Sequence, residues 1–151
     1  MKTIIISFVL VAVVSVCHAQ SKENPLLEEA KKAIAASNAI YSDLALKNDG
    51  SILSRYAEDA CLFPSNAPPL CGHENILKFF KEGEPLRSKF TIVNVYGDGK
   101  EYVTEETLYE LFNLKGEKID NGKILVLWKK TKDGWKMYRD MFSSNREQKS
   151  K

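Results

Sequence analysis

The sequence predicts an α+β fold from two observations. Apolar side chains recur at helical spacing in most of the chain before residue 84, and they alternate with polar ones after it. The predicted helices lie at residues 24–48, at 51–56 and between residues 72 and 83, and the predicted strands that follow lie at 89–96, 102–114, 123–130 and 135–143. Helices followed by a long antiparallel sheet are typical of an α+β domain.

Residues 1–19 have the features of a secretory signal peptide. A basic residue, Lys2, precedes a largely apolar run at 4–16, and the segment ends in the small residue Ala19. Because this run is too short to span a bilayer, we expect cleavage after residue 19 and no membrane association afterwards. The chain is then divided into the signal peptide (1–19), one domain (20–145) and a polar tail (146–151), and the protein is expected to be secreted and extracellular.

The first predicted helix has a clear start and a clear end. Asn24 is a capping residue and Pro25 fits the first turn, while the Asn-Asp-Gly sequence at 48–50 ends the helix. Ser51 is expected to cap the short second helix. The stripe that should face the sheet consists of Leu26, Leu27, Ala30, Ala33, Ile34, Ser37, Ile40, Tyr41 and Leu44. The third helix should turn Ile76, Phe79 and Phe80 inward and end at Gly83.

The segment 60–71 is predicted to form a short hairpin that turns near Asn66. That centre places Cys61 and Cys71 opposite each other, within the spacing that a disulfide requires. An exported chain favours a disulfide, although the prolines of the turn could shift the register and leave two free thiols. With His73 as the one histidine after residue 19, metal ligands are too few, so we expect no metal and no cofactor.

The charge balance excludes one class of partner. The formal net charge is +2, which offers no strongly basic surface for nucleic acid. We therefore expect no nucleic-acid binding.

Two phrases resemble one known superfamily. YAEDACLFPSNAPPLCGHENILKFF is similar to the helix-to-hairpin phrase of SnoaL-like proteins in the nuclear transport factor 2-like superfamily, and GKILVLWKKTKDGWKMYRDMFSSN resembles their closing strands. The resemblance spans roughly residues 28–145. It implies a cone in which three N-terminal helices are wrapped by a curved antiparallel sheet, with an apolar pocket at the open end. Many members form homodimers through the outer face of the sheet, and the same is expected here.

The superfamily includes ketosteroid isomerases, polyketide cyclases, dehydratases, epoxide hydrolases and proteins without known activity, so the fold does not choose the function. An isomerase needs a carboxylate base, a tyrosine and a protonated acid. Tyr41 matches the tyrosine by its position, but Phe63 stands where the resemblance places the base, and Ile124 or Leu125 where it places the acid. Ketosteroid isomerase activity is therefore disfavoured.

The other reactions of the superfamily also lack clear candidates. Arg139 and Asp140 are neighbours and point to opposite faces of a strand, so they do not form a hydrolase site by themselves. His73 lies at an outer helix start, away from where a cyclase or dehydratase needs it. On the strand 102–114, Glu106 and Glu110 share one face and Glu105 lies on the other. Charged residues on such a strand are expected on its solvated or dimer-facing side.

Asp140 and Tyr41 remain as the candidate site. Trp135 and Met137 are expected on one face of the last strand, and Tyr138, Asp140 and Phe142 on the other. Asp140 could bind a polar group of a ligand, or it could be a structural acid that accepts hydrogen bonds from the backbone or from Tyr41. The predicted pocket residues are Tyr41, Tyr56, Phe63, Phe80, Trp128, Tyr138, Asp140 and Phe142.

These features predict a secreted domain that binds a small hydrophobic ligand in an apolar pocket and has no identifiable catalytic set. One alternative is an enzyme of the isomerase, dehydratase or hydrolase type that uses Asp140 and Tyr41. The other is an extracellular matrix or assembly protein that uses only the sheet face and the disulfide.

Overall fold

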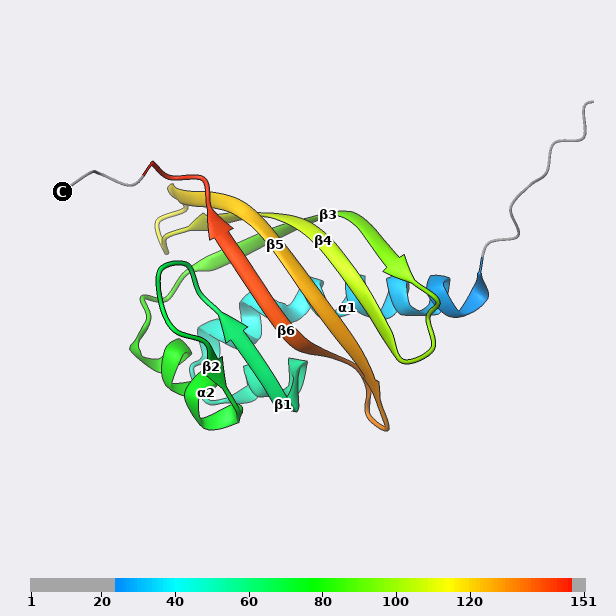
Figure 1. Cartoon of the computed structure of the whole chain (residues 1–151). Helices are drawn as coiled ribbons and strands as arrows, with labels where there is room; N and C mark the ends of the chain where they lie inside the picture. The colour runs from blue at the N-terminus through cyan, green and yellow to red at the C-terminus, as the bar shows by residue number, and fades with distance from the viewer. Residues whose placement is uncertain (1–23, 148–151) are drawn as a thin grey trace, which may run out of the picture.

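The computed structural model describes residues 24–147, so the predicted signal peptide and the last residues of the polar tail lie outside the described part. A six-stranded sheet forms the body of the protein, and its strands follow the order β2-β1-β6-β5-β4-β3. The helices cover one side of this sheet (Figure 1). The elements are α1 (Pro25–Lys47), the 3-10 helix η1 (Ser51–Arg55), β1 (Tyr56–Phe63), β2 (Leu70–Cys71), α2 (His73–Glu82), β3 (Arg87–Gly97), β4 (Tyr102–Phe112), β5 (Lys118–Thr131) and β6 (Gly134–Ser144).

The α+β class is confirmed, but two details of the predicted cone are wrong. There are two α-helices in the described part, because the predicted second helix is a single 3-10 turn of five residues. Gly50 precedes this turn with φ of 90° and the chain enters β1 directly after it, which leaves room only for a short connector. The sheet is also not wholly antiparallel, because β1 and β6 pair in parallel.

Helix α1 begins and ends as its sequence predicts. The Asn24 side chain accepts a hydrogen bond from the Leu26 backbone N–H, and Asn48 caps the other end with φ of 53°. Ala30, Ile34 and Ser37 are the buried residues of the helix. The prediction for Ile40 is wrong, since 45% of its surface is exposed. The face of the helix that contacts the core runs through Tyr41 and Ala45 instead.

The core lies between α1 and the inner face of the sheet. Its buried residues include Ile34, Val103, Val126, Trp128 and Met137. A bulge in β6 determines which side chains of that strand face the core. Trp128 pairs with Met137 and Leu127 pairs with Arg139, so Tyr138 is an extra residue without a partner in β5.

The cysteine pair is bonded as predicted. Cys61 and Cys71 pair across β1 and β2, and their sulfur atoms lie 2.02 Å apart. Asn66 adopts a left-handed conformation at φ of 59° in the turn between the two strands. The disulfide is compatible with an extracellular protein. Within the described part of the chain, no helix combines the length and the apolarity needed to cross a membrane.

Candidate functional site

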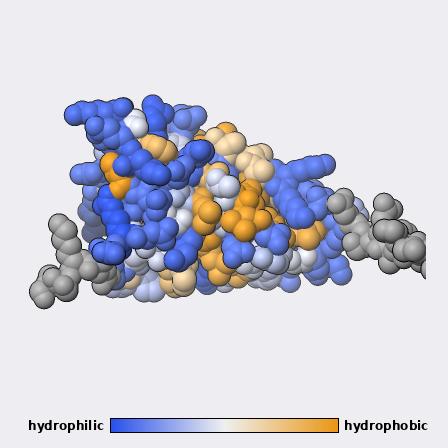
Figure 2. All heavy atoms as spheres, turned by 90° about the horizontal axis from the view of Figure 1, so that it is seen from above, coloured by the Kyte–Doolittle hydropathy of each residue, from blue (hydrophilic) through white to orange (hydrophobic). Residues whose placement is uncertain are grey.

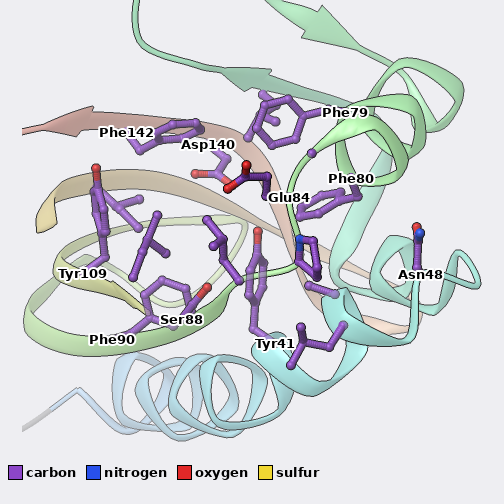
Figure 3. Close-up of a pocket in the computed structure, with 18 residues that line it drawn as sticks. Tyr41, Asn48, Phe79, Phe80, Glu84, Ser88, Phe90, Tyr109, Asp140 and Phe142 are labelled. Carbon is purple, nitrogen blue, oxygen red and sulfur yellow. The ribbon is translucent and has the colours of Figure 1, made fainter. Parts of the chain in front are cut away.

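A cavity of about 360 Å³ lies at the open end of the sheet. Its walls come from the C-terminal half of α1, from helix α2 and the loop that follows it, from Leu62 of β1 and from parts of β3 to β6 (Figure 3). Most of its lining is apolar. The residues that line it are Tyr41, Ala45, Leu46, Asn48, Leu62, Phe79, Phe80, Gly83, Glu84, Pro85, Leu86, Ser88, Phe90, Tyr109, Leu111, Ile124, Asp140 and Phe142.

Asp140 lies at the inner end of this cavity, where hydrogen bonds link its carboxyl group to two tyrosines. The Tyr56 hydroxyl donates a hydrogen bond of 2.9 Å to Oδ2 of Asp140. The Tyr41 and Tyr56 hydroxyls lie 3.2 Å apart. Because the Tyr56 hydroxyl already donates its hydrogen bond to Asp140, Tyr41 is the donor in this second bond. The other carboxylate oxygen of Asp140 accepts no side-chain or backbone hydrogen bond from residues 24–147. The chain of hydroxyls therefore satisfies one oxygen and leaves the other free to meet a ligand.

Burial controls the protonation of this group. Asp140 is only 6% exposed, and burial raises its pKa from 3.8 to about 6. The hydrogen bond from Tyr56 opposes the rise, and the negative charge of Glu105 adds to it. Burial also raises the pKa of the Tyr41 and Tyr56 hydroxyls, so both remain protonated donors at neutral pH. Asp140 is thus a carboxyl group whose proton equilibrium lies close to neutral pH.

Glu105 is a second buried acid behind Asp140, and its burial contradicts the expectation that charged residues of β4 face solvent. Glu105 is 1% exposed, and its carboxylate accepts hydrogen bonds from three donors. These are Asn38 Nδ2 at 2.6 Å, Thr107 Oγ1 at 2.7 Å and Trp128 Nε1 at 2.8 Å. The three donors offset the cost of burying the carboxylate. Glu106 and Glu110 do lie on the solvent side, as predicted.

A small polar cavity of about 30 Å³ separates the two acids. Asp140 and Glu105 both line it, together with Asn38 and Thr107. Tyr41, Phe90, Ile124 and Asp140 line both this cavity and the larger one. A water molecule needs about 10–15 Å³ of such space and two to four polar partners, so the small cavity can hold water behind Asp140.

The predicted pocket residues divide into three groups. Tyr41, Phe80, Asp140 and Phe142 line the cavity. Tyr56 and Trp128 lie behind it, where the Tyr56 hydroxyl supports Asp140 and Trp128 supports Glu105. Phe63 and Tyr138 do not line it.

The positions of Phe63 and Tyr138 have clear structural reasons. The cavity wall from β1 is Leu62, which pairs with Asp140, while Phe63 is one residue further along. The bulge turns Tyr138 to the outer side, where its ring lies against Tyr102 and beneath the Arg139 guanidinium at 3.6 Å. Of the two positions considered for an oxyanion acid, Ile124 lines the cavity and Leu125 is 51% exposed.

Several residues of the site were not among those predicted. Phe79, Phe90, Tyr109 and Leu111 supply much of the wall, and Glu84 lies in the loop at the mouth. Phe90 follows from the alternation of β3, which turns Ser88, Phe90 and Ile92 toward the helices. The loop at 83–86 carries no comparable pattern. Residues 24–147 contain no group of three or more histidine, cysteine, aspartate or glutamate side chains arranged to hold a metal ion.

Comparison with known proteins identifies the fold. No protein-family model and no curated protein sequence matches the chain. Among solved structures, the chain resembles a nuclear transport factor 2-like protein with a cystatin-like fold from Novosphingobium aromaticivorans at a TM-score of 0.69, with 16% identity over 79% of this chain and 84% of that one. A ketosteroid isomerase-like protein from Erwinia carotovora atroseptica gives a TM-score of 0.62, with 17% identity over 84% and 99% of the two chains.

A third structure is a nuclear transport factor 2-like protein of unknown function from Shewanella oneidensis, with a TM-score of 0.64 and 20% identity over 75% and 98% of the two chains. At these identities the similarity extends to the fold alone. It confirms the nuclear transport factor 2-like fold that the resemblance of the two sequence phrases implies, and it leaves the chemistry to the residues of this chain.

Proposed function

We propose that this protein, whose chain has the nuclear transport factor 2-like fold, binds a small, mainly apolar molecule that carries one polar group. The apolar part occupies the large cavity, and the polar group meets Asp140 at its inner end. The observation that carries the proposal is the free oxygen of a buried carboxyl group at the end of an apolar cavity. Binding cavities of about 300–1,000 Å³ commonly combine apolar walls with a few such polar groups.

The energetics of the cavity support a binding role. Empty space beside apolar side chains is costly, because the lining loses packing partners in proportion to the volume. A larger side chain in place of Leu111 or Ile124 would fill part of that space. Asp140 adds a second cost, since a carboxyl group whose pKa is raised by burial destabilises the folded state once it is ionised. Both costs are features expected of a site that exchanges stability for function.

The proposal includes secretion and pairing of two chains. The disulfide between Cys61 and Cys71 supports an oxidising compartment. The outer face of the sheet exposes apolar side chains that support a homodimer, and they are Val93, Tyr96, Leu108, Leu125 and Met141. Seen from above, the surface carries an apolar area bordered by hydrophilic residues (Figure 2). Leu125 and Met141 are directly paired, so they form adjacent parts of one patch.

Binding is tested with a neutral fluorescent probe, N-phenylnaphthylamine, whose emission rises in an apolar site. The wild type is expected to bind it at one saturable site, and Leu111→Trp is expected to abolish binding because the indole fills the cavity. The matched control is Leu26→Trp, at the opposite end of the molecule from the cavity in the first turn of α1, where the residue is 38% exposed. No saturable binding by the wild type, or equal binding by Leu111→Trp, would refute the proposal.

An enzymatic function is the second candidate, and the proton equilibrium of Asp140 favours it. General acid–base catalysis works best when the pKa of the group lies near the working pH, and burial raises that of Asp140 to about 6. Tyr41 and Tyr56 would then position the carboxyl group. This candidate requires a turnover that the wild type shows and Asp140→Asn loses, and equal rates in the two proteins would remove it. The matrix or assembly alternative is less well supported, because it requires no cavity.

A further inference from the structure

The charges around the cavity all have the same sign. Its lining contains two acidic residues, Glu84 at the mouth and Asp140 at the inner end, and no lysine, arginine or histidine. Behind Asp140, the small polar cavity adds Glu105 and again no basic residue. The three carboxyl groups thus lie at increasing depth along one path. Because the path lacks a compensating cation among the residues that line it, its potential favours a positively charged group.

The walls of the cavity suit a cation with an apolar body. Six aromatic rings contribute to the lining, from Tyr41, Phe79, Phe80, Phe90, Tyr109 and Phe142. Tyr41 lies between two of them, with ring centroids 5.2 Å from Phe90 and 6.1 Å from Phe80. Aromatic faces attract ammonium groups, and the attraction is strongest where water is excluded. The same rings offer a large apolar contact area to the rest of the ligand.

The site therefore has two complementary parts, and we propose that the ligand is an amphipathic amine whose ammonium group pairs with Asp140. The inference rests on the proposed binding function and names the ligand class for the same cavity. The ammonium donates to the free oxygen of Asp140, while Tyr56 continues to donate to the other oxygen. Glu84 attracts the amine at the mouth, and the aromatic walls contact its apolar body.

Other ligand classes fit the residues less well. A carboxylate or phosphate would meet Asp140 and Glu84 without any basic partner in the lining, so no attraction would offset the free-energy cost of its desolvation. A neutral alcohol can donate one hydrogen bond to Asp140, but a charge-assisted bond is about twice as strong. The groups that face Asp140 are Tyr56, Tyr41 and Glu105, and none of them neutralises its charge.

The test compares three probes with one naphthyl body and different polar ends, which are naphthylethylamine, naphthylethanol and naphthylacetate. Isothermal titration calorimetry at about pH 7.5, where Asp140 is ionised, measures each affinity. We expect the amine to bind about tenfold more tightly than the alcohol, and the acid most weakly. In Asp140→Asn the amine is expected to lose this advantage while the alcohol keeps its affinity.

Two further variants separate local from general charge effects. Glu106→Gln removes an exposed acid from the outer face of β4 and is expected to leave all three affinities unchanged. Glu84→Gln is expected to weaken the amine by a smaller factor, and the loss should shrink at high salt because Glu84 is exposed. Equal loss in Glu106→Gln and Asp140→Asn would overturn the pairing with Asp140.

The outcomes also separate this inference from the function on which it rests. If the wild type binds N-phenylnaphthylamine but binds the amine no more tightly than the alcohol, the ligand class is wrong and the binding function stands. If neither N-phenylnaphthylamine nor any naphthyl probe binds, both are refuted.

Discussion

Replacing Asp140 by asparagine should stabilise the protein relative to the wild type, and this gain in stability should be larger at neutral pH than at acidic pH. The side chains have nearly the same shape, and the asparagine oxygen can still accept the hydrogen bond that Tyr56 donates to Asp140. The variant lacks only the titrating group. Any difference in the pH dependence of the two proteins therefore reports on the carboxyl group of Asp140.

The magnitude follows from the pKa of Asp140, which burial raises from 3.8 to about 6. Because the folded state binds this proton more tightly than the unfolded state, the stabilisation is complete below the lower value and is lost as the pH rises through the higher one. The two values correspond to about 3 kcal/mol in total, at about 1.4 kcal/mol for each pH unit. Between about pH 4 and pH 7.5, the wild type should lose about 2 kcal/mol that Asp140→Asn keeps.

Urea denaturation followed by tryptophan fluorescence measures the free energy of unfolding at each pH. Trp128 and Trp135 are buried, so their emission changes when the fold opens. Glu106→Gln is the control, because it removes an exposed acid from the outer face and should give a curve parallel to the wild type. Parallel curves for the wild type and Asp140→Asn would refute the claim that burial raises the pKa of Asp140 to about 6.

Three more changes test other parts of the structure. Cys61→Ser combined with Cys71→Ser should lower the free energy of unfolding by about 2–3 kcal/mol, measured by calorimetry. Reducing agent should destabilise the wild type and should have no effect on this double variant. Gly122→Ala should lower the free energy of unfolding by at least about 1–3 kcal/mol and disturb probe binding. The reason is that the added Cβ would overlap the Tyr109 ring, which forms part of the cavity wall. Unchanged thermal unfolding would contradict this packing. Leu125→Glu should convert a dimer into monomers in sedimentation experiments without changing probe affinity, and a wild type that is already monomeric would refute pairing through the outer face.

Local signals in the sequence predicted much of the fold. Asn24 and Pro25 mark the start of α1 and Gly83 marks the end of α2, and these signals act within a few residues. The pairing of Cys61 with Cys71 follows from hairpin geometry, which is also local. The prediction of a second helix is wrong because the five residues between Gly50, which is left-handed, and β1 leave room only for a single 3-10 turn.

The errors in the site come from contacts between distant segments. A bulge in β6 depends on pairing with β5, and this shift turns Tyr138 outward while it keeps Met137 and Asp140 on the inner face. The burial of Glu105 depends on donors from α1 and β5, namely Asn38 and Trp128, which alternation within β4 cannot reveal. The role of Asp140 was predicted as either ligand-binding or structural. One of its oxygens accepts the hydrogen bond from Tyr56, and the proposed ligand would meet the other.

The most direct test of the account is an NMR titration of the side-chain carboxyl carbon of Asp140, without and with naphthylethylamine. We expect a midpoint near the value of about 6 that burial imposes on the pKa of this group, and a lower midpoint when the amine is bound, because an adjacent ammonium favours the ionised form. Naphthylethanol should produce a smaller change. A midpoint close to 3.8 in the free protein, or one that saturating amine leaves unchanged, would contradict the central claim that Asp140 is a buried, ligand-binding carboxyl group.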